Sequence, residues 1–149
     1  MEPLSLPSSG AVYLDASGFI YSAERIEPYR ELLAPMWRQA QAGRFTIVSS
    51  ELVVLETLVK PLRDGDATAE ALFRELFDAQ EVRLVPATRP LWEAAARMRA
   101  TTGLRTPDAL HAATALHAEC ALFITNDSDF RRVADLPTVV MDDLVAAES

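Results

Sequence analysis

Five short apolar segments that alternate with helical stretches constrain the fold of this chain more than any other feature. They are rich in strand-forming residues, lack a regular polar alternation, and span residues 11–14, 45–48, 82–85, 121–125 and 138–141. Strands that are apolar on both faces are typical of a parallel sheet covered by helices on each side. We therefore expect a three-layer α/β/α domain with a central, mainly parallel sheet of four to five strands.

The segments between the strands have the spacing of amphipathic helices. Helices are expected from about Phe19 and over residues 28–43, 51–62, 66–79, 88–103 and 106 onward. Ser49 or Ser50 is expected to cap the third of these, and Pro61 and Gly65 to end it. Residues 1–10 have no basic region and no long apolar region, so we expect a flexible N-terminal lead-in, and not a signal peptide, before a single domain at residues 11–149.

Length and composition narrow the class of protein. A chain of 149 residues is long enough for one domain with a substantial core, and it has no apolar run long enough to cross a membrane. The single cysteine, Cys120, cannot form an internal disulfide, which suits a reducing cytoplasm. The net charge of −8 argues against a protein that coats nucleic acid with a basic face.

Acidic residues stand at positions where a parallel sheet places its functional groups. Asp15 follows the first strand and Asp127 follows the fourth, and ligands bind outside the carboxyl ends of parallel strands. In the stretch RTPDALHAATA, Thr106 is expected as the helix N-cap and Pro107 at the first helical position. Asp108 then lies in the first turn, where the helix dipole favours its charge.

A fourth acid is less clearly indicated. Glu56 lies among apolar residues at helical spacing, and a charge in such a place needs a partner. Glu51 has apolar neighbours at matching spacings, so the pattern alone leaves both glutamates open.

Several carboxylates in one place repel one another unless a cation lies between them. Oxygen ligands favour Mg²⁺ or Mn²⁺, whereas His111 and His117 are six residues apart and do not form a helical zinc pair. His111 lies one turn after Asp108, but a role in surface or helix packing is the expectation for it. The acids therefore favour metal-assisted phosphodiester hydrolysis by an activated water.

These stretches resemble a known family. YLDAS, SSELVVLETL, RTPDALHAATA and FITNDSDF are similar in order and spacing to the four acidic motifs of PIN domains, and most similar to those of the VapC-type toxins of toxin–antitoxin systems. The resemblance covers residues 12–140. It implies an endoribonuclease that depends on Mg²⁺ or Mn²⁺, with Asp15, Glu56, Asp108 and Asp127 as the catalytic and metal-binding acids, and it favours Glu56 over Glu51.

The resemblance also implies partners and supporting positions. An RNA substrate, a cognate antitoxin, a homodimer and a cytoplasmic location are expected, and Asp15 and Asp108 are expected to contact the metal. The helices at residues 28–43 and 66–79 are contact surfaces or ordinary core.

Supporting residues, or simply caps and turn formers, are Ser17, Ser50, Thr125, Asn126 and Asp129. Arginines that could contact RNA are Arg97, Arg99, Arg105, Arg131 and Arg132. The alternative function is a catalytically silent PIN-like module that binds protein or RNA.

Overall fold

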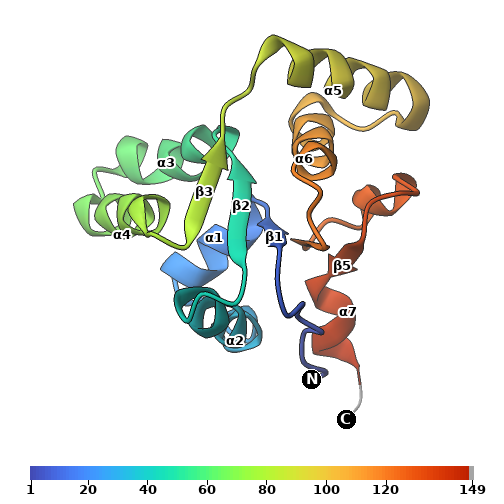
Figure 1. Cartoon of the computed structure of the whole chain (residues 1–149). Helices are drawn as coiled ribbons and strands as arrows, with labels where there is room; N and C mark the ends of the chain where they lie inside the picture. The colour runs from blue at the N-terminus through green and yellow to red at the C-terminus, as the bar shows by residue number, and fades with distance from the viewer. Residues whose placement is uncertain (148–149) are drawn as a thin grey trace.

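A computed structural model describes residues 1–147 and contains one five-stranded sheet (Figure 1). The strands are β1 (Ala11–Leu14), β2 (Thr46–Ser50), β3 (Val82–Val85), β4 (Leu122–Thr125) and β5 (Thr138–Val140). Their order is β3-β2-β1-β4-β5, and every neighbouring pair is parallel. The predicted strands and their parallel arrangement are therefore confirmed, and β1 is the central strand.

Seven α-helices and one 3₁₀ helix connect the strands and close the described chain. They are α1 (Ala16–Ala23), α2 (Tyr29–Gln41), α3 (Leu52–Asp64), α4 (Ala67–Asp78), α5 (Arg89–Thr102), α6 (Thr106–His117), η1 (Ser128–Arg132) and α7 (Met141–Ala146). Among residues 1–147, no helix has the length and apolar character to cross a bilayer.

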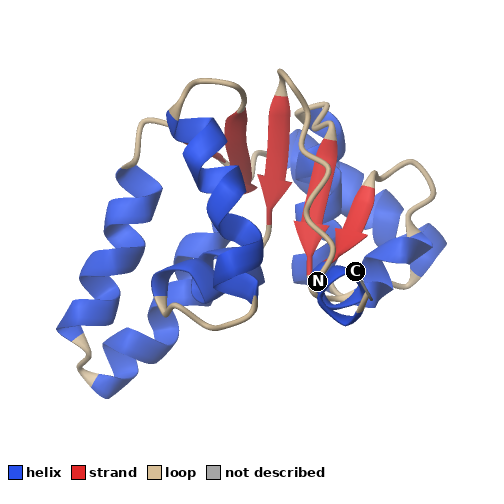
Figure 2. Ribbon diagram, turned by 90° about the horizontal axis from the view of Figure 1, so that it is seen from below, coloured by secondary structure: helices blue, strands red, loops and turns tan. Residues whose placement is uncertain are grey.

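The two faces of the sheet are covered by different helices. Successive side chains of a strand point to opposite faces, so Tyr13 joins the core under α5 and α6, whereas Val12 and Leu14 join the core under α1, α2 and α7. Figures 1 and 2 show α5 and α6 side by side and apart from α1–α4, with the sheet between the two groups. This arrangement is the predicted three-layer α/β/α domain.

Helix boundaries follow the local chemistry with small differences from prediction. Helix α3 continues through Pro61 and ends at Gly65, whose φ of 65° is left-handed and suits glycine. The N-cap of α3 is Glu51, so the prediction of Ser49 or Ser50 as its cap was wrong, although the Ser50 hydroxyl accepts a hydrogen bond from the Leu52 amide at 3.1 Å. The N-cap of α6 is Arg105, so the prediction of Thr106 was wrong by one residue, and Thr106 lies inside the first turn.

Two short elements escaped prediction because each is shorter than two turns. Met141, expected at the end of the last strand, instead begins α7 (Met141–Ala146), which has Asp142 and Asp143 in its first turn. Residues 128–132 form η1, which is capped by the Asp127 carboxylate.

The helices expected at residues 28–43 and 66–79, as contact surfaces or ordinary core, are α2 and α4. The burial of their apolar residues shows which parts of them are core. Leu32, Leu33 and Met36 of α2 are buried, so this face of α2 is core. On α4, Phe73 is buried, whereas Leu72 is 39% exposed, so only part of this helix is core.

The first ten residues contain no helix or strand. Leu4 and Leu6 pack against the α2–α7 side of the core, and the Glu2 amide donates a hydrogen bond to the Leu144 carbonyl at 2.9 Å. The flexibility expected of this lead-in stays a prediction.

Candidate functional site

Asp15 lies at the carboxyl end of the central strand and is almost fully buried. It is the N-cap of α1, where its Oδ1 accepts hydrogen bonds from the amide and the hydroxyl of Ser17 at 3.1 and 2.6 Å. Its Oδ2 accepts a hydrogen bond from the Thr125 hydroxyl. Burial raises the pKa of Asp15 above its usual value, although these hydrogen bonds act in the opposite direction.

Asp127 follows the neighbouring strand β4 and is joined to Asp15 through Thr125. The Asp127 amide donates to the Thr125 hydroxyl at 3.1 Å, and the Asp127 Oδ1 accepts from the Asp129 amide at 2.9 Å. Strands β1 and β4 are paired, with Leu14 opposite Ile124. The sheet therefore brings these two acids to one edge.

Asp108 reaches the same edge from the first turn of α6. Arg105 lies between the two aspartates, with its Nε 3.3 Å from Asp108 Oδ2 and a terminal nitrogen 3.8 Å from Asp127 Oδ2. Burial raises the pKa of Asp108, Arg105 lowers it, and the Asp127 charge raises it further. Asp108 and Asp127 therefore lie close enough to interact electrostatically.

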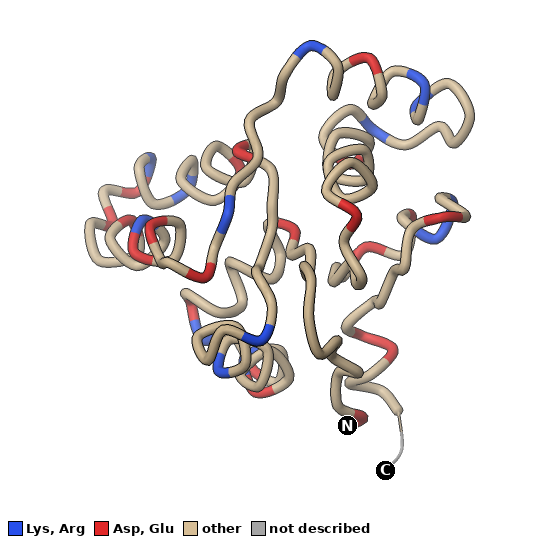
Figure 3. Tube along the Cα trace, in the orientation of Figure 1, with Lys and Arg blue, Asp and Glu red and all other residues tan. Residues whose placement is uncertain are grey.

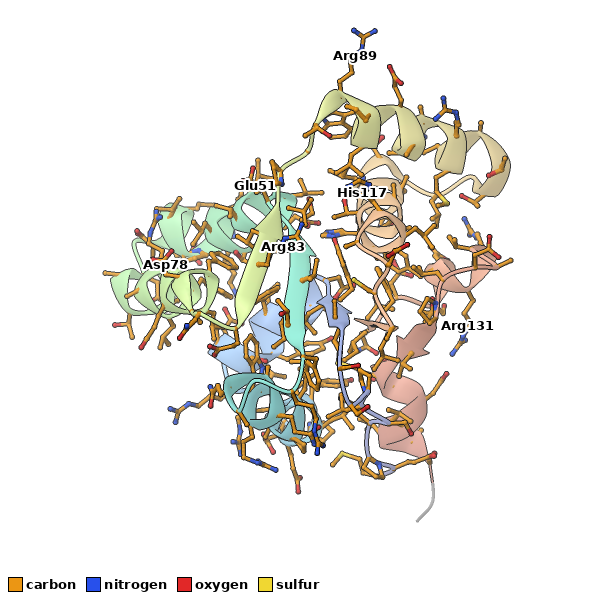
Figure 4. The ribbon with its side chains drawn as sticks, viewed as in Figure 1. Glu51, Asp78, Arg83, Arg89, His117 and Arg131 are labelled. Atoms are coloured by element: carbon orange, nitrogen blue, oxygen red, sulfur yellow. The ribbon has the colours of Figure 1, made fainter. Side chains whose placement is uncertain are left out.

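Glu56 is connected to the other acids through His111. The Glu56 Oε1 lies 2.6 Å from Nε2 of His111, and the His111 Nδ1 lies 2.6 Å from the Tyr13 hydroxyl. His111 also lowers the pKa of Asp15 and of Asp108, so it lies near both. Glu51 is exposed at the start of α3 and is labelled in Figure 4.

We define the acidic site as Asp15, Glu56, Asp108 and Asp127, which the fold connects through Thr125, Arg105 and His111. Sequence reasoning missed two of the residues that organise it, because it placed His111 in a packing role and did not consider Tyr13. The signal was a histidine and a tyrosine in stretches that are otherwise apolar, since buried polar groups need hydrogen-bond partners.

The donor set of the acidic site suits a hard divalent cation. Within residues 1–147, no group of three or more His, Cys, Asp or Glu side chains is placed so that it could hold a metal ion, so fewer protein ligands would have to suffice. Mg²⁺ is typically held by one or two carboxylates, and water and substrate phosphate complete its shell. Asp15 and Asp108 supply two buried carboxyl groups, and their oxygens are the donors that such an ion prefers.

The supporting residues proposed from the sequence divide into two groups. Ser17 and Thr125 bind Asp15 directly. The side chains of the others bind elsewhere: Ser50 accepts from the Leu52 amide, Asn126 accepts from the Asp142 amide at 2.9 Å, and Asp129 pairs with Arg132 at 3.4 Å.

The basic residues form no single face. Figure 3 shows Lys and Arg scattered over the outer helices and loops, and in Figure 4 Arg89 and Arg131 project away from the body. Of the arginines expected to contact RNA, Arg105 lies at the acidic site. Arg131 pairs with Asp143, and Arg99 donates to the Leu104 carbonyl and the Thr106 hydroxyl.

Comparison with known proteins identifies the family. The family model described as PIN domain matches residues 12–136, so this chain belongs to the PIN domain family. A comparison with curated proteins finds no significant match.

Solved structures share the fold at low sequence identity. VapBC2 from Rickettsia felis, bound to a DNA fragment from its promoter, has a TM-score of 0.67 and 18% identity, covering 87% of this chain and 97% of that one. A toxin–antitoxin complex from Klebsiella pneumoniae has a TM-score of 0.60 and 18% identity, with coverage of 86% and 95%. VapBC-5 from Mycobacterium tuberculosis has a TM-score of 0.53 and 20% identity, with coverage of 89% and 97%.

Proposed function

We propose that this PIN domain is an endoribonuclease that hydrolyses RNA phosphodiester bonds with the help of Mg²⁺ or Mn²⁺. The observation that carries the proposal is that Asp15 and Asp108, from distant parts of the chain, are both buried at one sheet edge and both have raised pKa values. Keeping two such groups ionised near neutral pH is costly without a cation. Perturbed carboxyl groups of this kind are typical of functional sites.

The residues of the acidic site have separable roles in this proposal. Asp15 and Asp108 would hold the ion, with Asp127 and Glu56 contributing to its shell or to a bound water. The bound ion supplies a water of lowered pKa and neutralises charge on the phosphate. Thr125 and Ser17 hold the Asp15 carboxylate by hydrogen bonds, so its oxygens keep a fixed direction.

Arg105 is the cation of this chain best placed to bind the substrate backbone. Its side chain is 74% exposed and reaches toward both Asp108 and Asp127. A guanidinium suits phosphate because it donates two parallel hydrogen bonds. Since the net charge of the chain is −8, RNA binding would depend on such a local contact and not on a broad basic face.

The test is RNA cleavage by the purified chain with and without Mn²⁺. Cleavage should require the ion, stop in excess EDTA, and be lost in Asp15→Asn and in Asp108→Asn while both variants remain folded. Cleavage that persists in EDTA, or that both variants retain, would refute the proposal. Binding of RNA without any cleavage would instead favour the catalytically silent module.

We further propose that the chain acts as the toxin of a toxin–antitoxin pair, in the cytoplasm. Its support is the PIN family match, together with a fold shared with proteins whose descriptions name VapBC or a toxin–antitoxin complex. Expression of the chain alone should arrest growth, and co-expression of the cognate antitoxin should restore it. Unimpaired growth at a verified expression level would contradict this role.

Protein partners, either the antitoxin or a second copy in a homodimer, often bind at exposed apolar residues. Helix α3 offers such residues, because Leu55, Val59 and Leu62 are 64%, 50% and 56% exposed and follow one another at helical spacing. Leu55→Ser with Val59→Ser should weaken association in sedimentation experiments and leave RNA cleavage by the free chain unchanged. Unchanged association would exclude this face.

A further inference from the structure

Three elements meet through a buried chain of hydrogen bonds beside the acidic site. Tyr13 lies on β1, His111 on α6 and Glu56 on α3, and both links of the chain are 2.6 Å long. Tyr13 and His111 are at most 2% exposed, and the Glu56 side chain is 25% exposed. This series of hydrogen bonds therefore runs from Tyr13 in the core, through His111, to Glu56, which is the residue of the three that reaches solvent.

The direction of the hydrogen bonds follows from the phenol. A phenol holds its hydrogen near neutral pH, so the Tyr13 hydroxyl can donate to His111 Nδ1, which lies 2.6 Å away. When the phenol donates a hydrogen bond to Nδ1 of His111, Nδ1 is the acceptor and carries no hydrogen of its own. The imidazole in this tautomer has its hydrogen on Nε2. That hydrogen points at Oε1 of Glu56.

The surroundings favour this direction. Tyr13 stacks on Phe123 with ring centroids 4.9 Å apart, and it meets His111 edge to face at 5.8 Å. The Ser49 hydroxyl on β2 is buried and has no hydrogen-bond partner within residues 1–147, so it does not compete with His111 for the phenol hydrogen.

We propose that His111 is a positioning residue that fixes the Glu56 carboxylate at the acidic site, and that Tyr13 sets the imidazole tautomer which allows it to do so. Free glutamate side chains lose considerable rotamer entropy when they are ordered, and Glu56 is the one acid of the site that comes from α3. The hydrogen bond from His111 occupies Oε1 of Glu56, so the second oxygen of this carboxylate is available to an ion or a water. This inference rests on the proposed nuclease function, since it assigns Glu56 a role in that site.

The first test separates positioning from folding through kinetics. His111→Phe should lower kcat for RNA cleavage about 10- to 100-fold, the range seen when a group that orients a metal-site ligand is removed. The KM for RNA should change less than about twofold, and His111→Gln, whose amide can still donate, should recover part of kcat. His117→Gln is the matched control because His117 is exposed at the far end of the same helix. Full kcat in a folded His111→Phe variant would overturn the proposal.

The second test does not use activity. In ¹⁵N NMR spectra of the wild type, His111 should carry hydrogen on Nε2 with Nδ1 as acceptor, and Tyr13→Phe should release a mixture of tautomers. A wild-type Nδ1–H tautomer, or no change in Tyr13→Phe, would overturn the proposal. If the wild type cleaves no RNA but shows the expected tautomer, the nuclease function fails while the hydrogen-bond assignment stands.

Discussion

The Thr125 hydroxyl donates a hydrogen bond to the Asp15 carboxylate, although 110 positions separate the two residues in the sequence. The hydroxyl oxygen of Thr125 also accepts a hydrogen bond from the Asp127 amide at 3.1 Å. One buried hydroxyl therefore connects two acids at the ends of adjacent strands. This contact ties the geometry of the acidic site to the register of the sheet.

Replacing Thr125 should lower both the stability of the fold and the activity of the acidic site. Thr125→Val keeps the shape of the side chain but leaves a carboxylate oxygen of Asp15 and the Asp127 amide without their partner. Loss of such a buried hydrogen bond costs about 1–3 kcal/mol, which urea unfolding would measure, and RNA cleavage should fall. Thr114→Val is the matched control, because Thr114 is equally buried but bonds to Leu110 in its own helix. Equal cleavage by the two variants would contradict a role of Thr125 in the site.

Neutralising Asp108 should stabilise the fold in the absence of metal. Folding raises the pKa of Asp108, so the folded state binds this proton more tightly than the unfolded state, and the group lowers stability as pH rises through the raised pKa. Asp108→Asn should therefore be more stable than wild type near pH 7 in EDTA. The difference should shrink as pH falls below the usual carboxyl range. Urea unfolding across pH measures it, and a difference that does not depend on pH would contradict the assignment.

A divalent ion should stabilise the wild type and not its site variants. A ligand that binds only the folded state adds about 2.7 kcal/mol at a concentration 100 times its Kd. Thermal unfolding should show a rise of Tm with Mn²⁺ that is strongly reduced in Asp15→Asn and in Asp108→Asn. Asp78→Asn is the control, because Asp78 is an exposed acid at the end of α4, away from the site (Figure 4). Equal shifts in all four proteins would place the ion elsewhere.

Removing the Arg105 guanidinium should affect RNA and metal in opposite directions. Arg105→Gln should weaken RNA binding and reduce the slope of log affinity against log salt by about one. Mn²⁺ affinity should hold or rise, because Arg105 no longer competes for the oxygens of Asp108 and Asp127. Arg74→Gln on α4, where Arg74 pairs with Glu70, controls for net charge. Filter binding and calorimetry provide the two measurements; an unchanged salt slope would remove Arg105 from the RNA contact.

Several parts of the site could be predicted because they depend on local sequence. Asp15 and Asp127 follow apolar runs, and such runs predict strand ends without knowledge of the rest of the chain. Helix α4 begins close to where it was expected, because capping by the Asp66 carboxylate needs only a side-chain oxygen and an amide three residues later.

The position of Asp108 could not be predicted in the same way. Helix α6 has 12 residues and is about 18 Å long, whereas β4 has four residues and is shorter. Whether the start of α6 reaches the end of β4 depends on how the connecting loop turns and how the helix packs on the sheet. The contact of Arg105 with both Asp108 and Asp127 demonstrates that it does.

The sequence by itself determined the succession of the five strands and the six longer helices along the chain, the parallel sheet, and the strand ends at which Asp15 and Asp127 lie. Hydrophobic periodicity and capping act over only a few residues, so these features could be predicted locally. The tertiary structure alone decided that Glu56 meets His111, that His111 meets Tyr13, and that Leu72 stays exposed. These contacts join elements far apart in the chain. They depend on how helices pack against the sheet, which local patterns do not specify.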